Sequence, residues 1–248
     1  MHSSFTQLRN ALARRQQQGV PLQLFLRDDD VTDDEPSLRR LLTLCARHTI
    51  PINLGVIPGR LTAAGIAVLN DYVQQQPGLL ELNQHGWQHV NHEPTGKKCE
   101  FGPSRDYAAQ LADLAAGQAK MNEAFGAQWS PVFVPPWNRC TAVTARALAQ
   151  LGFRALSRDA GQAPLPDCRE VPVTLDLFRW RGGAVLRAAD ELADELAQQI
   201  ASTDRVGLLL HHQVLDDAAF ALLDEWLRLF NQFPIVRRHT FQSLLDPC

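Results

Sequence analysis

Two short segments contain most of the side chains that could bind a metal or move a proton. The aspartates Asp28–Asp30 follow an apolar run at residues 22–26, and His85 and His89 follow another at residues 79–82. Each run is typical of a buried strand, so both clusters are expected at the carboxyl ends of strands, where catalytic groups gather in α/β folds. A carboxylate with two imidazoles is a common ligand set for a catalytic Zn²⁺ with one open position. The pattern indicates a metal-dependent hydrolase.

The acidic cluster allows more than one arrangement. Along a regular strand Asp28 and Asp30 point to one face and Asp29 to the other. A strand end often bends, and adjacent carboxylates can then reach one cavity, where one binds a metal and the other stays free as a base. The competing interpretation is a solvated acidic loop that continues through residues 33–35.

The histidine cluster has the spacing of a chelating pair. Residues four apart lie on one face of a helical turn, which brings the imidazoles of His85 and His89 together. Gly86 disfavours a long helix but permits a tight turn. His92 follows and could also approach an ion. The alternative is a set of surface histidines in a polar loop.

A second histidine pair, His211 and His212, ends the apolar run at residues 206–210. A histidine at a buried strand end is suited to general acid–base catalysis near neutral pH. Because adjacent strand residues point to opposite faces, we expect only one of the two to enter a site. We expect this residue to be His211, with His212 either facing away or lining the rim, where it could contact the substrate.

A proline-rich turn supplies candidate substrate contacts: Pro136, Trp137 and Asn138. The prolines restrict the backbone, and Trp137 offers a flat apolar wall. Arg139 or Arg27 could orient a carboxylate. The alternative is a rigid turn with a packing tryptophan.

The composition narrows the class of protein. The chain has 248 residues, with 24 basic and 27 acidic side chains, so nothing in its charge favours nucleic acid or an anionic membrane as a partner. The five cysteines form no Cys-x-x-Cys pair, which argues against a cysteine-based zinc site. No apolar run reaches the roughly 20 residues of a membrane span, and the first residues lack the apolar segment of a signal peptide. We therefore expect a cytoplasmic protein.

Strand and helix patterns alternate along the chain. Continuous apolar strands separated by amphipathic helices predict a parallel sheet covered on its outside. About seven strand–helix units favour a barrel over an open sheet. We expect one α/β domain over residues 1–248, with a helix at residues 5–18 packed on it. Further expectations are a long loop at residues 91–107, a strand at residues 171–180 and a last helix at about residues 216–230.

In their order, these motifs resemble those of the polysaccharide deacetylase family, carbohydrate esterase family four. Its Thr-Phe-Asp-Asp-Gly strand end is similar to residues 27–31, and its His-Ser/Thr-x-x-His motif to residues 85–89. Its Arg-x-Pro-aromatic-Gly motif is similar to residues 134–138, and its Leu-x-His strand end to residues 209–211. The resemblance covers about residues 22–215.

The resemblance implies a distorted (β/α)7 barrel, a divalent metal, most simply Zn²⁺, and a role for each polar residue. It implies three metal ligands: Asp30, His85 and His89. Asp29 would be the general base and His211 the general acid. A register with Asp28 and Asp29 as the functional pair stays open.

The departures from the family pattern concern the rim of the site. Val134 stands where the third motif begins with arginine, so Arg27 or Arg139 would have to substitute for it. Val31 and Asn138 replace glycines. The tryptophan-bearing fourth motif has no clear match.

The function expected from these residues is metal-dependent hydrolysis of an amide C–N bond, most simply deacetylation of an amino sugar or related compound. The partner would then be a carbohydrate or a small amide substrate, with no nucleic acid and no membrane. Two alternatives are a non-catalytic carbohydrate-binding barrel, and a metallohydrolase of a cyclic amide or an ester.

Overall fold

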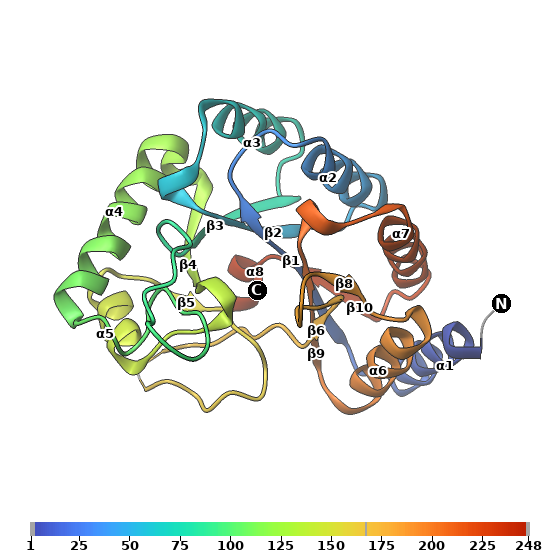
Figure 1. Ribbon diagram of the computed structural model, residues 1–248. Helices are drawn as coiled ribbons and strands as arrows, with labels where there is room; N and C mark the ends of the chain where they lie inside the picture. The colour runs from blue at the N-terminus through green and yellow to red at the C-terminus, as the bar shows by residue number, and fades with distance from the viewer. Residues whose placement is uncertain (1–2, 167, 247–248) are drawn as a thin grey trace.

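The computed structural model describes residues 3–166 and 168–246 and contains a parallel sheet surrounded by helices (Figure 1). Neighbouring strands follow the order β5-β4-β3-β2-β1-β9-β6, and β10 pairs with the first part of β1. The strands of this sheet are β1 (Leu22–Val31), β2 (Ile52–Val56), β3 (Leu80–His85), β4 (Trp129–Val134), β5 (Ala155–Leu156), β6 (Leu175–Asp176), β9 (Arg205–Leu210) and β10 (Val236–His239).

Helices lie around the outside of the sheet, apart from α8, which is seen in the middle of the ring (Figure 1). Proline at the first position of α2 and side-chain caps at Thr62 and Asp106 explain where three of the helices begin. The α-helices are α1 (Ser3–Gln18), α2 (Pro36–His48), α3 (Ala63–Gln75), α4 (Tyr107–Phe125), α5 (Ala142–Gln150), α6 (Ala189–Ser202), α7 (Asp217–Asn231) and α8 (Phe241–Leu245).

Only a few backbone contacts join the two ends of this row of seven strands into a barrel. Leu156 and Asp159, in β5 and just after it, form isolated parallel bridges with Glu170 and Val173. The segment that contains these partners leads directly into β6, which pairs with β9. This arrangement confirms the distorted (β/α)7 barrel, and β10 is an additional strand beside β1.

The alternation of side chains along β1 separates two cores. Leu24 and Leu26 are fully buried in the large core between the sheet and the outer helices. Phe25 points the other way and belongs to a smaller interior core with Phe241 of α8, their ring centroids 5.3 Å apart. The amino-terminal part of the barrel is therefore filled. α8 packs there, and Asn53 Oδ1, near the start of β2, accepts the backbone N–H of Phe241 at 2.7 Å.

Two parts of the fold differ from the expectation. The strand predicted at residues 171–180 is divided into β6 and β7 (Phe178–Arg179), because Asp176 Oδ1 accepts the N–H of Phe178 at 2.9 Å and turns the chain. The second piece pairs antiparallel with β8 (Val185–Leu186) in a separate hairpin. In addition, β10 and α8 follow the last predicted helix.

The lengths and apolar character of the described helices bear on whether any could span a bilayer. Within residues 3–166 and 168–246, none combines the length and the apolar character needed to cross a membrane.

Candidate metal and catalytic site

The carboxyl ends of β1, β3 and β9 meet at one edge of the sheet and form a pocket of about 200 Å³. The three expected metal ligands lie together here, with one donor atom from each within 4.8 Å of the others. Asp30 Oδ1 is 3.2 Å from His85 Nε2 and 3.3 Å from His89 Nε2. One carboxylate oxygen and two imidazole nitrogens at this spacing fit a single divalent ion with room for further ligands.

A bend at the end of β1 brings adjacent carboxylates into the same pocket. The register between β1 and β2 shifts between Asp28 and Val31, and Asp30 has a left-handed backbone with φ of 70°. Asp29 and Asp30 consequently both line the pocket, whereas Asp28 does not. The irregular strand end explains why two consecutive aspartates can both reach one cavity.

The two candidate histidine ligands converge through a turn and not through the helical spacing that the sequence suggested. β3 ends at His85, and Gly86 and His89 both have a left-handed backbone, with φ of 62° and 57°. The Nδ1 of His85 lies 3.0 Å from the carbonyl oxygen of Val134, so this carbonyl orients the ring with Nε2 toward Asp30. His92 is exposed and lies outside the ligand group.

The electrostatics of this group favour metal binding. Burial acts to raise the pKa of Asp30, but His85 and His89 hold it below its ordinary value. Burial and the neighbouring His85 lower the pKa of His89 to about 4. Burial opposes the charged form of His85, yet Asp29 and Asp30 together raise its pKa, so a metal ion would compete with a proton for this imidazole. The donor set therefore fits a divalent cation.

Asp29 is held by the arginine that precedes it in the same strand. The Arg27 guanidinium, fully buried, donates to Asp29 Oδ2 at 2.8 Å, to Asn138 Oδ1 at 2.6 Å and to the backbone oxygen and Oγ of Ser157, each at 3.0 Å. The other oxygen, Asp29 Oδ1, is buried without a hydrogen-bond partner in the described part of the chain. Val134 occupies the position where the resembled motif has an arginine, and Arg27 and Arg139 were the two candidates to replace it. Of these two, Arg27 is the one that contacts Asp29.

Arg27 was expected to contact the substrate directly, but its position is different. Arg27 is covered by Asp29 and Asn138 and is not part of the pocket wall, so it acts on the site through these side chains. Asn138 does line the pocket, and its φ of 57° is a conformation that asparagine tolerates better than most residues other than glycine. The replacement of a family glycine by Asn138 is therefore compatible with the same backbone.

The two histidines at the end of β9 lie in different environments. His211 lines the pocket and packs edge-on against Trp180, with ring centroids 4.5 Å apart. His212 is fully buried outside it, and its backbone N–H and Nδ1 contact the two carboxylate oxygens of Asp28 at 2.7 and 2.6 Å. Of the two placements expected for His212, the structure shows the one that faces away from the pocket, because this side chain is paired with Asp28 and is not part of the pocket wall.

The remaining wall of the pocket is aromatic and polar. Trp137 lies against His89, with ring centroids 4.3 Å apart, and Arg139 lines the rim beside it. Pro136, the third residue expected to contact the substrate in this turn, is buried and is not part of the pocket wall. Proline at this position shapes the turn instead.

The sequence patterns did not identify three residues of the wall: Asp159, Asp176 and Trp180. Asp176 accepts the indole N–H of Trp180 at 2.8 Å, and burial raises the pKa of both aspartates. A Gly182-Gly183 pair between two short extended segments is a hairpin signal that could have located Trp180 near a strand end.

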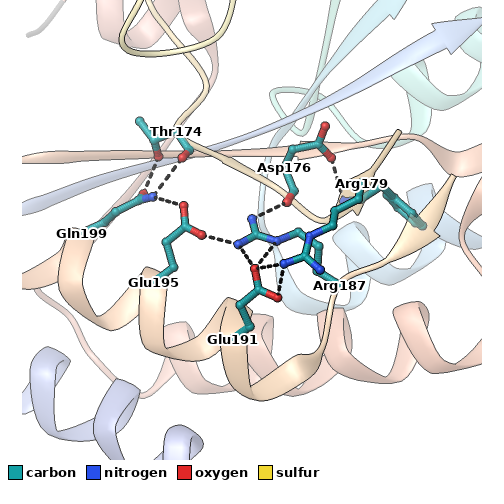
Figure 2. A network of polar contacts seen from close by, with 8 residues as sticks. Thr174, Asp176, Arg179, Arg187, Glu191, Glu195 and Gln199 are labelled. Carbon is teal, nitrogen blue, oxygen red and sulfur yellow. Dashed lines mark hydrogen bonds and ion pairs between the residues drawn. The ribbon is translucent and has the colours of Figure 1, made fainter. Parts of the chain in front are cut away.

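Figure 2 shows how this hairpin is attached to α6. Arg187 donates to the backbone oxygen of Asp176 at 3.1 Å and to Glu191 at 2.7 Å, and it also contacts Glu195. Arg179 reaches Glu191 at 2.8 Å. These ion pairs link both strands of the hairpin to a helix of the outer ring, so Trp180 is presented to His211 by an anchored segment.

Comparison with known proteins identifies the fold. No protein-family model matches the sequence, and no curated protein matches it. Among solved structures, a protein from Mycobacterium smegmatis, provisionally assigned as a polysaccharide deacetylase, is 16% identical with a TM-score of 0.70, covering 92% of this chain and 90% of that one. A family 4 acetyl xylan esterase from Clostridium thermocellum, in complex with a cobalt ion, is 14% identical with a TM-score of 0.62. The match covers 90% of this chain and 89% of the esterase.

A family 4 carbohydrate esterase from Streptomyces lividans, in complex with acetate, is 13% identical with a TM-score of 0.54. The match covers 90% of this chain and 92% of the esterase. The likeness extends over nearly the whole of each chain, so it concerns the complete barrel and not a local motif. The chain therefore has the fold of the family 4 carbohydrate esterases and polysaccharide deacetylases.

Proposed function

We propose that this protein is a metal-dependent hydrolase of amide C–N bonds that removes an acetyl group from an amino sugar or a related compound. The observation that carries the proposal is the convergence of three metal-donor atoms within 4.8 Å in a pocket that also contains Asp29 and His211. The solved family 4 structures with a cobalt ion and with acetate support the same chemistry.

Asp30, His85 and His89 would hold one divalent ion, most simply Zn²⁺. When bound, the ion supplies Lewis-acid chemistry, which polarises a substrate carbonyl and makes a water molecule more acidic. The donor set supports this assignment, because the carboxylate is ionised and the pKa of His89, at about 4, leaves that imidazole neutral at neutral pH.

Asp29 is the proposed general base. Its Oδ1 is buried and has no hydrogen-bond partner among the described residues, so it is available to accept a proton. Its Oδ2 is occupied by Arg27 at 2.8 Å, which holds the carboxylate in one orientation. As Asp29 takes the proton of the attacking water, the water oxygen forms a bond to the carbonyl carbon.

His211 is the proposed general acid. An amine anion cannot leave, so the amide nitrogen must gain a proton as the C–N bond breaks. His211 lines the same pocket and is held by the ring of Trp180. Its proton goes to the nitrogen, and the products are a free amine and a carboxylic acid.

The pocket wall supports a carbohydrate or a small amide as substrate. Trp137 and Trp180 provide flat apolar surfaces, and Asn138, Asp159 and Asp176 provide groups that can hydrogen-bond to hydroxyls. The cavity of about 200 Å³ suits a small group such as an acylated sugar unit, while any longer chain would extend outside it.

The direct test is amine release by metal-free protein and by protein reconstituted with Zn²⁺ or Co²⁺. The substrates are N-acetylglucosamine, its oligomers, a cyclic amide and an acetyl ester. We expect metal-dependent release of amine from the acetylated amino sugars, and none from a His85→Ala, His89→Ala double variant, which should also lose stoichiometric metal. Sugar binding without turnover would favour the non-catalytic barrel, and turnover of the cyclic amide or ester alone would favour the other hydrolase.

A further inference from the structure

The turn that joins the two histidine ligands is contacted by a buried carboxylate from a distant loop. Glu100 is 0% exposed and lies in the segment between the histidines and α4. Its Oε1 accepts the backbone N–H of Gln88 at 2.7 Å, and its Oε2 accepts that of Trp87 at 3.2 Å. Both amides belong to the short stretch between His85 and His89, so one side chain holds the backbone that spaces the ligands.

This turn needs support from outside because its conformation is intrinsically unfavourable. His89 has a φ of 57°, a left-handed conformation that costs free energy for any residue with a Cβ. Such residues persist where the surrounding structure over-determines them. At Gly86 the approach of Glu100 is so close that a Cβ would lie 2.1 Å from Glu100 Oε2. Only glycine at position 86 lets the carboxylate reach the turn.

The loop that supplies Glu100 is organised by its own hydrogen bonds. Asn91 Oδ1 accepts the backbone N–H groups of Glu93 and Cys99, at 3.1 and 2.9 Å. Glu93 in turn accepts the hydroxyl of Ser104 at 2.7 Å and its N–H at 3.1 Å. These bonds, together with those of Lys98 and Cys99 to Arg139, hold the segment in a compact loop that delivers Glu100 to the turn.

We propose that Glu100 is a positioning residue of the metal site, which holds His89 Nε2 beside His85 and Asp30. The proposal rests on the metal-dependent function proposed above. A carboxylate suits this role because it accepts at both oxygens, whereas a glutamine would turn an NH₂ group toward one of the two N–H donors. Loss of a partner that orients a ligand typically weakens metal affinity by about 10- to 100-fold.

Glu81 offers a matched control on the strand that carries His85. It is also a buried glutamate, 5% exposed, and it accepts the backbone N–H of Gln242 at 2.8 Å near the opposite end of β3. Its other oxygen accepts the side-chain N–H of Asn83 at 3.0 Å. Glu100→Gln and Glu81→Gln thus remove the same charge, and each disturbs two accepted hydrogen bonds. Only the first change touches the turn between the ligands.

The experiment measures Zn²⁺ affinity by calorimetry on chelator-treated protein, together with the free energy of unfolding of each metal-free variant. We expect Glu100→Gln to weaken Zn²⁺ binding by about 10- to 100-fold, and Glu81→Gln to leave the affinity unchanged even if both variants lose stability. The visible spectrum of the Co²⁺-loaded protein should change only in Glu100→Gln, because it reports the arrangement of the ligands. If that variant does not fold, Glu100→Asp serves, since its shorter carboxylate retains the charge but reaches the two amides less well.

Unchanged Zn²⁺ affinity in the folded Glu100 variants would overturn the positioning role, and so would an equal loss in Glu81→Gln. Absence of Zn²⁺ binding by the wild-type protein would instead overturn the proposed function itself. The two failures are therefore distinguishable in one series of titrations.

Discussion

Replacing Arg27 by methionine should destabilise the protein by about 5 kcal/mol, and adding Asp29→Asn should recover about 2 kcal/mol of that loss. The methionine keeps much of the volume of the arginine stem but removes every donor. In the single variant the Asp29 carboxylate remains buried, with 4% of its side chain exposed, and has lost the guanidinium at 2.8 Å. The double variant removes the charge that has lost its partner.

The magnitude follows from the contacts of the guanidinium. Breaking a buried ion pair by deleting one partner costs about 3–5 kcal/mol, because an uncompensated charge stays in the interior. The oxygens of Ser157 and Asn138 also lose donors at 3.0 and 2.6 Å, and each unsatisfied buried acceptor adds about 1 kcal/mol or more. Water in the pocket can reach Asn138, which lines it, so its share of the cost is smaller.

The assay is urea unfolding of four metal-free proteins at one pH: wild type, the two single variants and the double variant. The dependence of unfolding free energy on urea should have the same slope in all four, so that differences in midpoint report stability. A coupling energy within about 0.5 kcal/mol of zero would refute the reasoning, because contacts that do not interact behave additively at that level. A double variant less stable than Arg27→Met would refute it as well.

Three further predictions concern catalysis and pH. His211→Ala should retain metal but lower amide hydrolysis by about 10²–10⁴, with a smaller loss on an activated ester, and equal losses on the two substrates would argue against the acid role. Trp180 is 48% exposed over the pocket, so Trp180→Ala should raise KM for sugar oligomers more than for a small amide; a fall in kcat alone would contradict a role in binding. Burial acts to raise the pKa of Glu170, but Arg158 at 2.9 Å and the N–H of Leu165 at 2.8 Å hold it below its ordinary value. A depressed folded-state pKa gives stability that is present above the unfolded value and is lost as pH falls through the folded one. The free energy of unfolding should therefore decline below about pH 4.3, and less steeply in Glu170→Gln; equal slopes in the two proteins would show that this pair contributes nothing.

Much of the barrel could be predicted from local patterns. The apolar run at residues 206–210 corresponds to β9, and the last helix, expected at about residues 216–230, corresponds to α7 (Asp217–Asn231). These elements can be predicted because a buried strand or an amphipathic helix requires apolar residues at a spacing set by its own geometry. The irregular elements could not be predicted in this way. β10 pairs with β1 outside the main order of strands and has two arginines among its four residues, so its pattern is not that of a buried strand.

The sequence by itself determined which side chains come to one edge of the sheet. Asp30, His85 and His211 lie at the carboxyl ends of three strands, and parallel strands end together. Only the tertiary structure decided how these side chains are held. Arg27 meets Asn138 across 111 positions of the chain, and Trp180 meets His211 through a hairpin anchored on α6. Likewise, the left-handed turn at His89 depends on a carboxylate from a separate loop. Such contacts depend on the packing of distant segments, and no local periodicity encodes them.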